Sequence, residues 1–153
     1  IKIKMNSFTS YKMVDKLYEA SNAGVKIQLI IRGICCLVPG VPGMSENIEV
    51  ISVIDKFLEH TRLFVFSNDG DPKIYISSAD WMTRNLDYRV EVGCPIYDTD
   101  IKNELIDTFN MAWQDNTKSR WLTDQESPYR KLAGAPLRSQ FAMYDYYKEK
   151  LES

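Results

Sequence analysis

The first part of the chain changes from the hydrophobic period of a strand to that of a helix and back. Residues 1–7 alternate apolar with basic or polar side chains, as a strand with one buried face does. Residues 10–24 place apolar side chains at helical spacing, with Ser10 as the expected N-cap and Gly24 as the stop. Residues 25–32 alternate and then turn wholly apolar, which is typical of a strand buried on both faces. This order predicts a βαβ unit with parallel strands and a right-handed crossover.

Shorter elements are expected in the middle of the chain. Residues 33–47 contain three glycines and two prolines, so they predict an irregular loop after the second strand. The alternation of charged and apolar residues in 88–92 predicts a strand with one face in water. The other strands are expected at 48–54, 63–66 and 74–78, with single helical turns at 56–59 and 80–85 and a hairpin-type turn at 67–72.

A long helix begins the last third of the chain. Asp98, Thr99 or Asp100 can cap it, and residues 117–137 after it lose any regular period. We interpret the apolar stripe of this helix as core packing; it consists of Ile101, Leu105, Ile106, Phe109, Ala112 and Trp113. A final helix over 138–151 carries an apolar and aromatic side that predicts docking against protein, made of Phe141, Tyr144, Tyr147 and Leu151. The sequence therefore predicts a single α/β domain over 1–153, with 117–153 as an irregular segment plus a helix packed on it.

Composition narrows the class of protein. The 153 residues are 44% apolar and 12% aromatic, enough for one domain with a proper core. The net charge of −2 argues against a nucleic-acid or membrane-surface binder, so a polyanionic ligand requires locally gathered cations. Three cysteines give no disulfide framework, and neither a signal peptide nor a spanning apolar run is present, so we expect a cytoplasmic protein. The chain starts without methionine inside a strand pattern, from which we expect a piece of a longer polypeptide.

The candidate chemistry gathers in residues 57–92, which contain the only histidine. His60 starts a strand, and Arg62, two residues on, points to the same face. Arg32 follows the buried strand 25–31 at its carboxyl end, where open α/β sheets form ligand crevices. The alternatives are a structural histidine and an arginine that tethers its own loop. The His-x-Arg pair is reminiscent of the His-x-Lys of phospholipase D-type enzymes, which need two such sites, and no ligand set for a metal is visible.

A second polar cluster follows the strand that ends at 78. Ser77, Ser78 and Asn85 could donate hydrogen bonds to phosphate oxygens, and Arg84 could pair with them in a bidentate way. Asp80 would repel phosphate, so we expect it to orient an arginine or to cap the following turn. The alternative is an ordinary strand-to-helix corner. No glycine-rich phosphate loop of the Walker or dinucleotide type is present. Taken together, these residues predict a phosphate-binding α/β domain.

Several long stretches resemble the carboxyl-terminal catalytic domain of bacterial polyphosphate kinase. They read RGICCLVPG, SENI, FLEHTRLFVF and YISSADWMTRNLDYRVEV, and with LYEASNAGVKIQLIIRG and SQFAMYDYYK the similarity covers the whole chain. The resemblance implies a phospholipase D-like domain with a mixed, mostly parallel sheet flanked by helices. It also implies reversible transfer of the ATP γ-phosphate to polyphosphate through a phosphohistidine, with Mg²⁺.

The resemblance also assigns roles to two residues. Arg32 matches the arginine that contacts nucleotide or polyphosphate phosphates, and His60 matches a second active-site histidine that assists transfer. The phosphorylated histidine and the Mg²⁺ site belong to the preceding domain, so the isolated chain is expected to be inactive. We expect the longer parent enzyme to be a homo-oligomer. Its association with a membrane stays an open alternative. Two alternatives stay open, a non-catalytic nucleotide- or polyphosphate-binding module and half of a phosphodiesterase. In all of them, Arg32 and His60 are expected to converge on one crevice.

Overall fold

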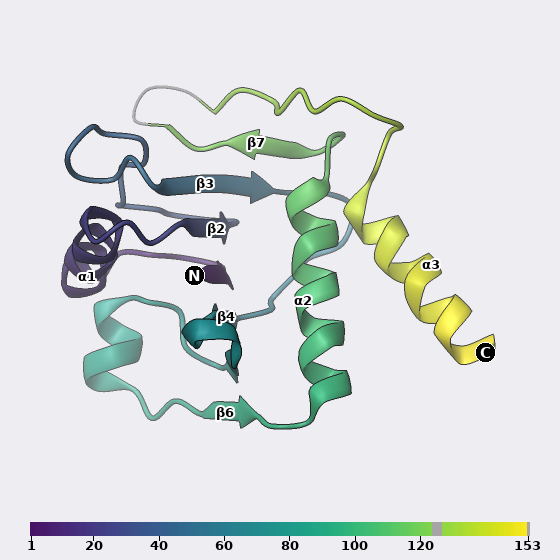
Figure 1. The fold of residues 1–153 in the computed structure, drawn as a ribbon, viewed down its shortest axis with the longest axis horizontal. Coiled ribbons are helices and arrows are strands. Elements are labelled where there is room, and N and C mark those ends of the chain that lie inside the picture. The colour runs from purple at the N-terminus through teal and green to yellow at the C-terminus, as the bar shows by residue number, and fades with distance from the viewer. Residues whose placement is uncertain (124–126, 153) are drawn as a thin grey trace.

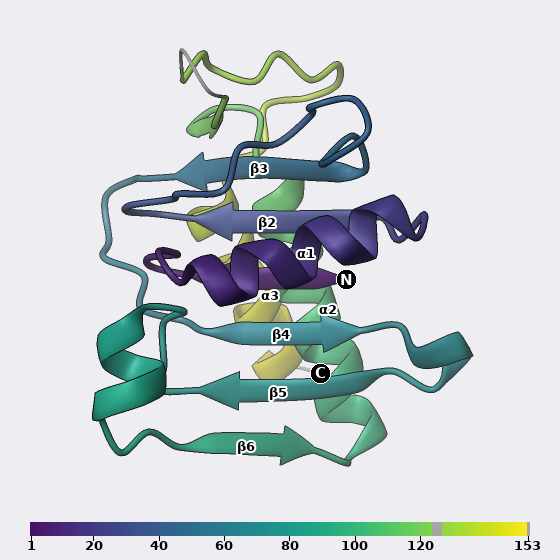
Figure 2. The same ribbon diagram turned by 90° about the vertical axis from the view of Figure 1, so that its left-hand side faces the viewer.

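A computed structural model of the chain describes residues 1–123 and 127–152 and forms a single sheet between helices (Figure 1). Helix α1 (Tyr11–Asn22) covers one face, while α2 (Thr99–Gln114) and α3 (Ser139–Glu152) lie on the other (Figure 2). The seven strands have the order β6-β5-β4-β1-β2-β3-β7. Their bounds are β1 Lys2–Met5, β2 Ile27–Ile31, β3 Ile48–Val53, β4 Leu63–Phe66, β5 Lys73–Ser77, β6 Gly93–Ile96 and β7 Ser119–Trp121.

The sheet is mixed, as expected, and the β1-α1-β2 unit has the predicted parallel strands. The expectation that the sheet is mostly parallel is wrong. Only β1–β2 and β2–β3 are parallel, whereas β1–β4, β4–β5, β5–β6 and β3–β7 are antiparallel. The connection explains one of the antiparallel pairs, because antiparallel neighbours can be joined by a short turn whereas parallel neighbours need a crossover. The turn at 67–72, with the 3₁₀ segment Asn68–Gly70, joins β4 to β5 in this way.

Two hydrophobic clusters hold the helices on the sheet. On the α1 face, Val14 and Leu17 pack with alternate residues of β1, β2 and β3. On the α2 face, Phe109 and Ala112 pack with residues of β2, β3, β4 and β5. Ile30 belongs to the second cluster and its neighbours in β2 to the first, so the prediction that this strand is buried on both faces is confirmed.

The expected helical turn at 56–59 and the expected strand at 88–92 are both wrong. The backbone N–H and carbonyl of Phe57 are bonded to the side chain of Gln140, and this long-range contact replaces a local turn. In 88–92 the Glu91 side chain turns inward to accept hydrogen bonds, while Val90 is 100% exposed. The strand lies at β6 instead, and the expected helical turn at 80–85 is displaced to a π-helical turn at Arg84–Tyr88.

The carboxyl-terminal third is held by polar contacts that the hydrophobic pattern did not reveal. Asp98 caps α2 by accepting from two backbone N–H groups, which confirms one of the expected caps, whereas the Ser10 side chain makes no such bond at α1. Asp115, fully buried, accepts backbone hydrogen bonds from the start of β7 and of α3. Strand β7 was not expected. Residues 124–126 and 153, which belong to the predicted range 117–153, lie outside the described residues.

The apolar side of α3 remains largely open. Met143 packs on the core, but Tyr144 is 67% and Leu151 is 89% exposed. A docking role for this side stays a prediction.

Candidate active site

The strands bring the candidate residues to one end of the sheet. Met5, the last residue of β1, pairs with Ile31, the last residue of β2. Because β4 is antiparallel to β1, its first residue Leu63 pairs with Lys4 near that same end. Asn6, Arg32 and Arg62 therefore lie just beyond strand ends that are hydrogen-bonded neighbours.

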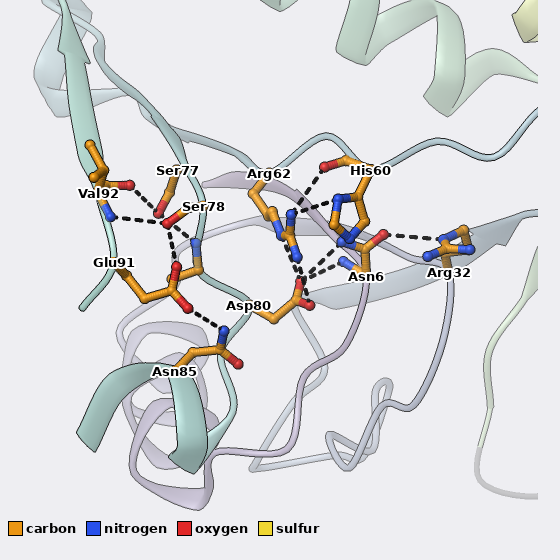
Figure 3. Close-up of polar contacts among 11 residues, drawn as sticks. Asn6, Arg32, His60, Arg62, Ser77, Ser78, Asp80, Asn85, Glu91 and Val92 are labelled. Atoms are coloured by element: carbon orange, nitrogen blue, oxygen red, sulfur yellow. Dashed lines mark hydrogen bonds and ion pairs between the residues drawn. The ribbon is translucent and has the colours of Figure 1, made fainter. Parts of the chain in front are cut away.

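Five side chains form a hydrogen-bonded row across this end, which we call the polar row: Arg32, Asn6, Asp80, Arg62 and His60 (Figure 3). Arg32 Nε donates to Asn6 Oδ1 at 3.1 Å, and Asn6 donates to Asp80 Oδ1 from its backbone N at 2.9 Å and from Nδ2 at 3.3 Å. Arg62 donates to both oxygens of Asp80 from Nε and Nη2, each at 3.2 Å. Arg62 Nη1 lies 3.0 Å from His60 Nδ1.

Asp80 is the centre of the row. It is 5% exposed, and although burial alone raises the pKa of its carboxyl, hydrogen bonds from Arg62 and from the Asn6 backbone outweigh burial and lower the pKa below its ordinary value. The carboxylate thus remains charged and fully engaged with its neighbours. The expectation that Asp80 orients an arginine is confirmed, and the alternative that it caps the following turn is not needed.

Arg32 and His60 are the first and the last residue in this series of hydrogen bonds. Arg32 is half-buried, and among the described residues no carboxylate pairs with its guanidinium, so its two Nη groups remain donors for an anion. His60 is exposed, not sealed among aliphatic side chains. Both residues thus lie near the same end of the sheet, while their convergence on one crevice and their roles stay predictions.

Gly33 allows the segment after β1 and the loop after β2 to lie close together. Its backbone N donates to the Asn6 carbonyl oxygen at 2.6 Å. A Cβ at this position would lie 3.0 Å from the same oxygen, so a side chain would push β1 and the loop after β2 apart.

Apart from Asp80, the residues of the second expected cluster lie outside the row, and most of them form hydrogen bonds within the protein. Ser77 donates to the Val92 carbonyl at 3.0 Å, and both Ser78 and Asn85 donate to the Glu91 carboxylate. These hydrogen bonds from Ser78 and Asn85 lower the pKa of Glu91. Supporting contacts from these three residues to phosphate stay a prediction, and would require their present bonds to open.

Arg84 lies on the π-helical turn, is exposed, and forms no ion pair within the described residues. Sequence reasoning missed Asn6, the residue that joins Arg32 to Asp80. Its signal was available: a polar residue directly after a buried strand, at the same end of the sheet as Arg32.

The residues that the structure describes do not fit a Mg²⁺ site. Within residues 1–123 and 127–152, no group of three or more His, Cys, Asp or Glu residues could hold a metal ion. The carboxylate in the row, Asp80, uses both oxygens for Arg62 and Asn6. In the same ranges, no helix is long and apolar enough to cross a bilayer.

A cavity of about 680 Å³ lies at the other end of the sheet, where β2 begins and β4 ends. Its lining includes Lys26, Gln28 and Ser67 but no residue of the polar row. We place the candidate site at the row because Arg32 and His60, the residues predicted to act on phosphate, belong to it and do not line the cavity.

Comparison with known proteins identifies the family. The model of the polyphosphate kinase C-terminal domain 2 matches residues 1–140. Polyphosphate kinase from Vibrio parahaemolyticus is 51% identical over 148 residues, which are 95% of this chain and 21% of that protein. The crystal structure of polyphosphate kinase from Porphyromonas gingivalis superposes with a TM-score of 0.96 at 42% identity, covering 99% of this chain and 24% of that one.

The same comparison bears on the fold. NucT from Helicobacter pylori, 15% identical, superposes with a TM-score of 0.55 over 71% of this chain and 75% of that one, which is a likeness of fold alone. The phospholipase D-like fold is thereby confirmed. This chain spans about a fifth of the length of the curated relatives it matches. The chain belongs to the polyphosphate kinase family and corresponds to the second of its C-terminal domains.

Proposed function

We propose that this chain forms one wall of the active site of a polyphosphate kinase, which reversibly transfers the γ-phosphate of ATP to inorganic polyphosphate. The observation that carries the proposal is the polar row, which holds one unneutralised guanidinium and one exposed imidazole on the same end of the sheet. Phosphoryl transfer asks a protein chiefly to position the reactants and to stabilise charge on the phosphoryl oxygens. Arg32 and His60 are suited to both tasks.

In this proposal the two residues act on different oxygens. The free Nη groups of Arg32 bind a phosphate of the nucleotide or of the polyphosphate chain, where a guanidinium can donate two parallel hydrogen bonds. His60 donates a hydrogen bond to an oxygen of the phosphoryl group that moves. The exposed imidazole and the half-buried guanidinium are the parts of the row that a polymer passing along this end of the sheet would contact.

The remaining groups are supplied from outside this chain. We place the phosphorylated histidine in another domain of the same polypeptide, because the only histidine here is held by Arg62. We place the Mg²⁺ ligands there as well, since the described residues of this chain contain no group that could hold a metal ion. The isolated 153 residues therefore bind substrates at most and do not turn them over. A cytoplasmic, homo-oligomeric parent enzyme completes the proposal.

The test uses the full-length enzyme that contains this chain. His60→Ala and Arg32→Gln should each reduce ATP–polyphosphate turnover about a hundredfold, the usual range for losing one catalytic donor. Arg120→Gln, which removes an exposed arginine of the edge strand β7 that forms no contact with the row, is the matched control and should leave turnover unchanged. Normal turnover in both site variants would refute the proposal.

A second measurement tests whether the isolated chain can be phosphorylated without the rest of the enzyme. The isolated chain, incubated with γ-labelled ATP, should remain unlabelled. A stable phosphohistidine at His60 would contradict the assignment of the nucleophile to another domain.

A further inference from the structure

The donors of Arg62, a possible supporting residue for phosphate binding, are already committed within the protein. Nε and Nη2 donate to the two oxygens of Asp80, and Nη1 lies 3.0 Å from His60 Nδ1 and 3.4 Å from the His60 carbonyl oxygen. The Arg62 side chain is only 12% exposed. A phosphate would have to displace one of these contacts to reach the guanidinium.

The contact with His60 has only one chemically allowed direction. A guanidinium can donate hydrogen bonds but cannot accept one. His60 Nδ1 must therefore be the acceptor, which means that it carries no proton. In a neutral imidazole with an unprotonated Nδ1, the proton resides on Nε2. No group in the described part of the chain bonds to Nε2, so this N–H is available to a ligand.

We propose that Arg62 is a positioning residue that fixes His60 as the neutral Nε2–H tautomer, so that His60 acts as a hydrogen-bond donor and not as a phosphate-accepting nucleophile. The proposal deepens the function proposed above and rests on it for its catalytic meaning. A nucleophilic imidazole needs an unprotonated nitrogen facing the phosphorus. In His60 that nitrogen is Nδ1, and Arg62 covers it, while Nε2 presents a proton.

Asp80 gives the arrangement its rigidity. The guanidinium is planar, so two bonds to one carboxylate set the direction of the third donor, Nη1. Asp80 is in turn held by the backbone N and the amide of Asn6. Protonation of His60 at Nδ1 would place two donors face to face, and the pair would have to separate. A neutral N–H held in this way can stabilise negative charge on an oxygen without transferring its proton.

The tautomer is measured directly, because His60 is the only histidine in the sequence and its ring nitrogens give unambiguous signals. In the ¹⁵N-labelled 153-residue chain at mildly alkaline pH, a long-range ¹H–¹⁵N correlation spectrum should show one tautomer of His60. Nε2 should have the shift of a protonated nitrogen, and Nδ1 that of an unprotonated nitrogen accepting a hydrogen bond. A protonated Nδ1 in the unaltered protein would overturn the proposal without any substitution.

Arg62→Lys tests whether the arginine is responsible. Lysine keeps the positive charge beside Asp80 but lacks the planar fork, so Nδ1 should move towards the shift of a free nitrogen and the second tautomer should appear. Arg120→Gln should leave the imidazole signals unchanged, and backbone amide spectra report whether each variant is folded. Imidazole signals in folded Arg62→Lys identical to those of the unaltered protein would overturn the proposal.

Kinetics of the full-length enzyme separate this proposal from the proposed function. If both hold, Arg62→Lys should lower kcat about tenfold or more with little change in the KM for ATP, because Arg32 still binds phosphate. If the tautomer is as expected but His60→Ala retains full turnover, the proposed catalytic role of His60 fails and the positioning of its ring by Arg62 stands. If the tautomer differs but His60→Ala is inactive, the positioning by Arg62 fails and the proposed catalytic role of His60 stands.

Discussion

Removing the Asp80 carboxylate should destabilise the protein far more than removing an ordinary surface charge. Asp80→Ala deletes the acceptor of four hydrogen bonds, two from Arg62 and two from Asn6. The side chains of the ion pair are 12% exposed for Arg62 and 7% for Asp80, so the guanidinium would be left mostly buried and without its partner.

The magnitude follows from that burial. Breaking a buried ion pair from one side costs about 3–5 kcal/mol, because an uncompensated charge remains in the protein. The row is near the surface and water can reach part of it, so we expect the low end, about 3 kcal/mol. For a chain of this length each kcal/mol shifts Tm by roughly 2–4 °C, which gives a fall of about 6–12 °C.

Urea unfolding monitored by circular dichroism measures the loss, and a double-mutant cycle assigns it. Arg62→Met should also destabilise, and the double variant should lose less than the sum by about 1–3 kcal/mol. The exposed pair Lys73–Asp71, with its atoms 2.5 Å apart, provides the matched control, and Asp71→Ala should cost less than about 1 kcal/mol. A loss below about 1 kcal/mol for Asp80→Ala, or strict additivity with Arg62→Met, would refute the reasoning.

Three further outcomes are expected from the same structure. Gly33→Ala should cost about 1–3 kcal/mol in urea unfolding, since its Cβ would press on the Asn6 carbonyl, whereas Gly93→Ala meets nothing within 4 Å and should be near neutral. Asp98→Ala should reduce stability by about 1 kcal/mol and fray the start of α2 in amide exchange, because two capped N–H groups lose their acceptor. Asp115 has a pKa lowered below the ordinary 3.8, since backbone hydrogen bonds outweigh the opposing effect of burial. Its contribution is therefore present above pH 3.8 and lost as pH falls through the lowered value, and Asp115→Asn should flatten that part of the stability–pH profile.

The hydrophobic pattern by itself determined the central sheet. Three local signals carry this information: the alternation in β1, the buried run in β2 and the apolar face of the helix between them. Each signal depends only on the spacing of apolar residues along a short segment, so it does not require knowledge of distant contacts. The placement of Arg32 at a strand end followed from the same pattern. The long stretches that resemble polyphosphate kinases indicated the family from the sequence alone.

Other features depended on contacts that no local pattern contains. The turn expected at 56–59 gave way to Gln140, more than eighty residues away, and the strand expected at 88–92 gave way to bonds that Glu91 makes with Ser78 and Asn85. A sequence can suggest that a residue begins or ends a strand, but only tertiary pairing decides which ends are neighbours. Only the fold therefore placed Asn6 between Arg32 and Asp80 and turned an isolated histidine into one whose Nδ1 faces a guanidinium, because hydrogen bonds depend on distance and direction in space rather than on spacing along the chain.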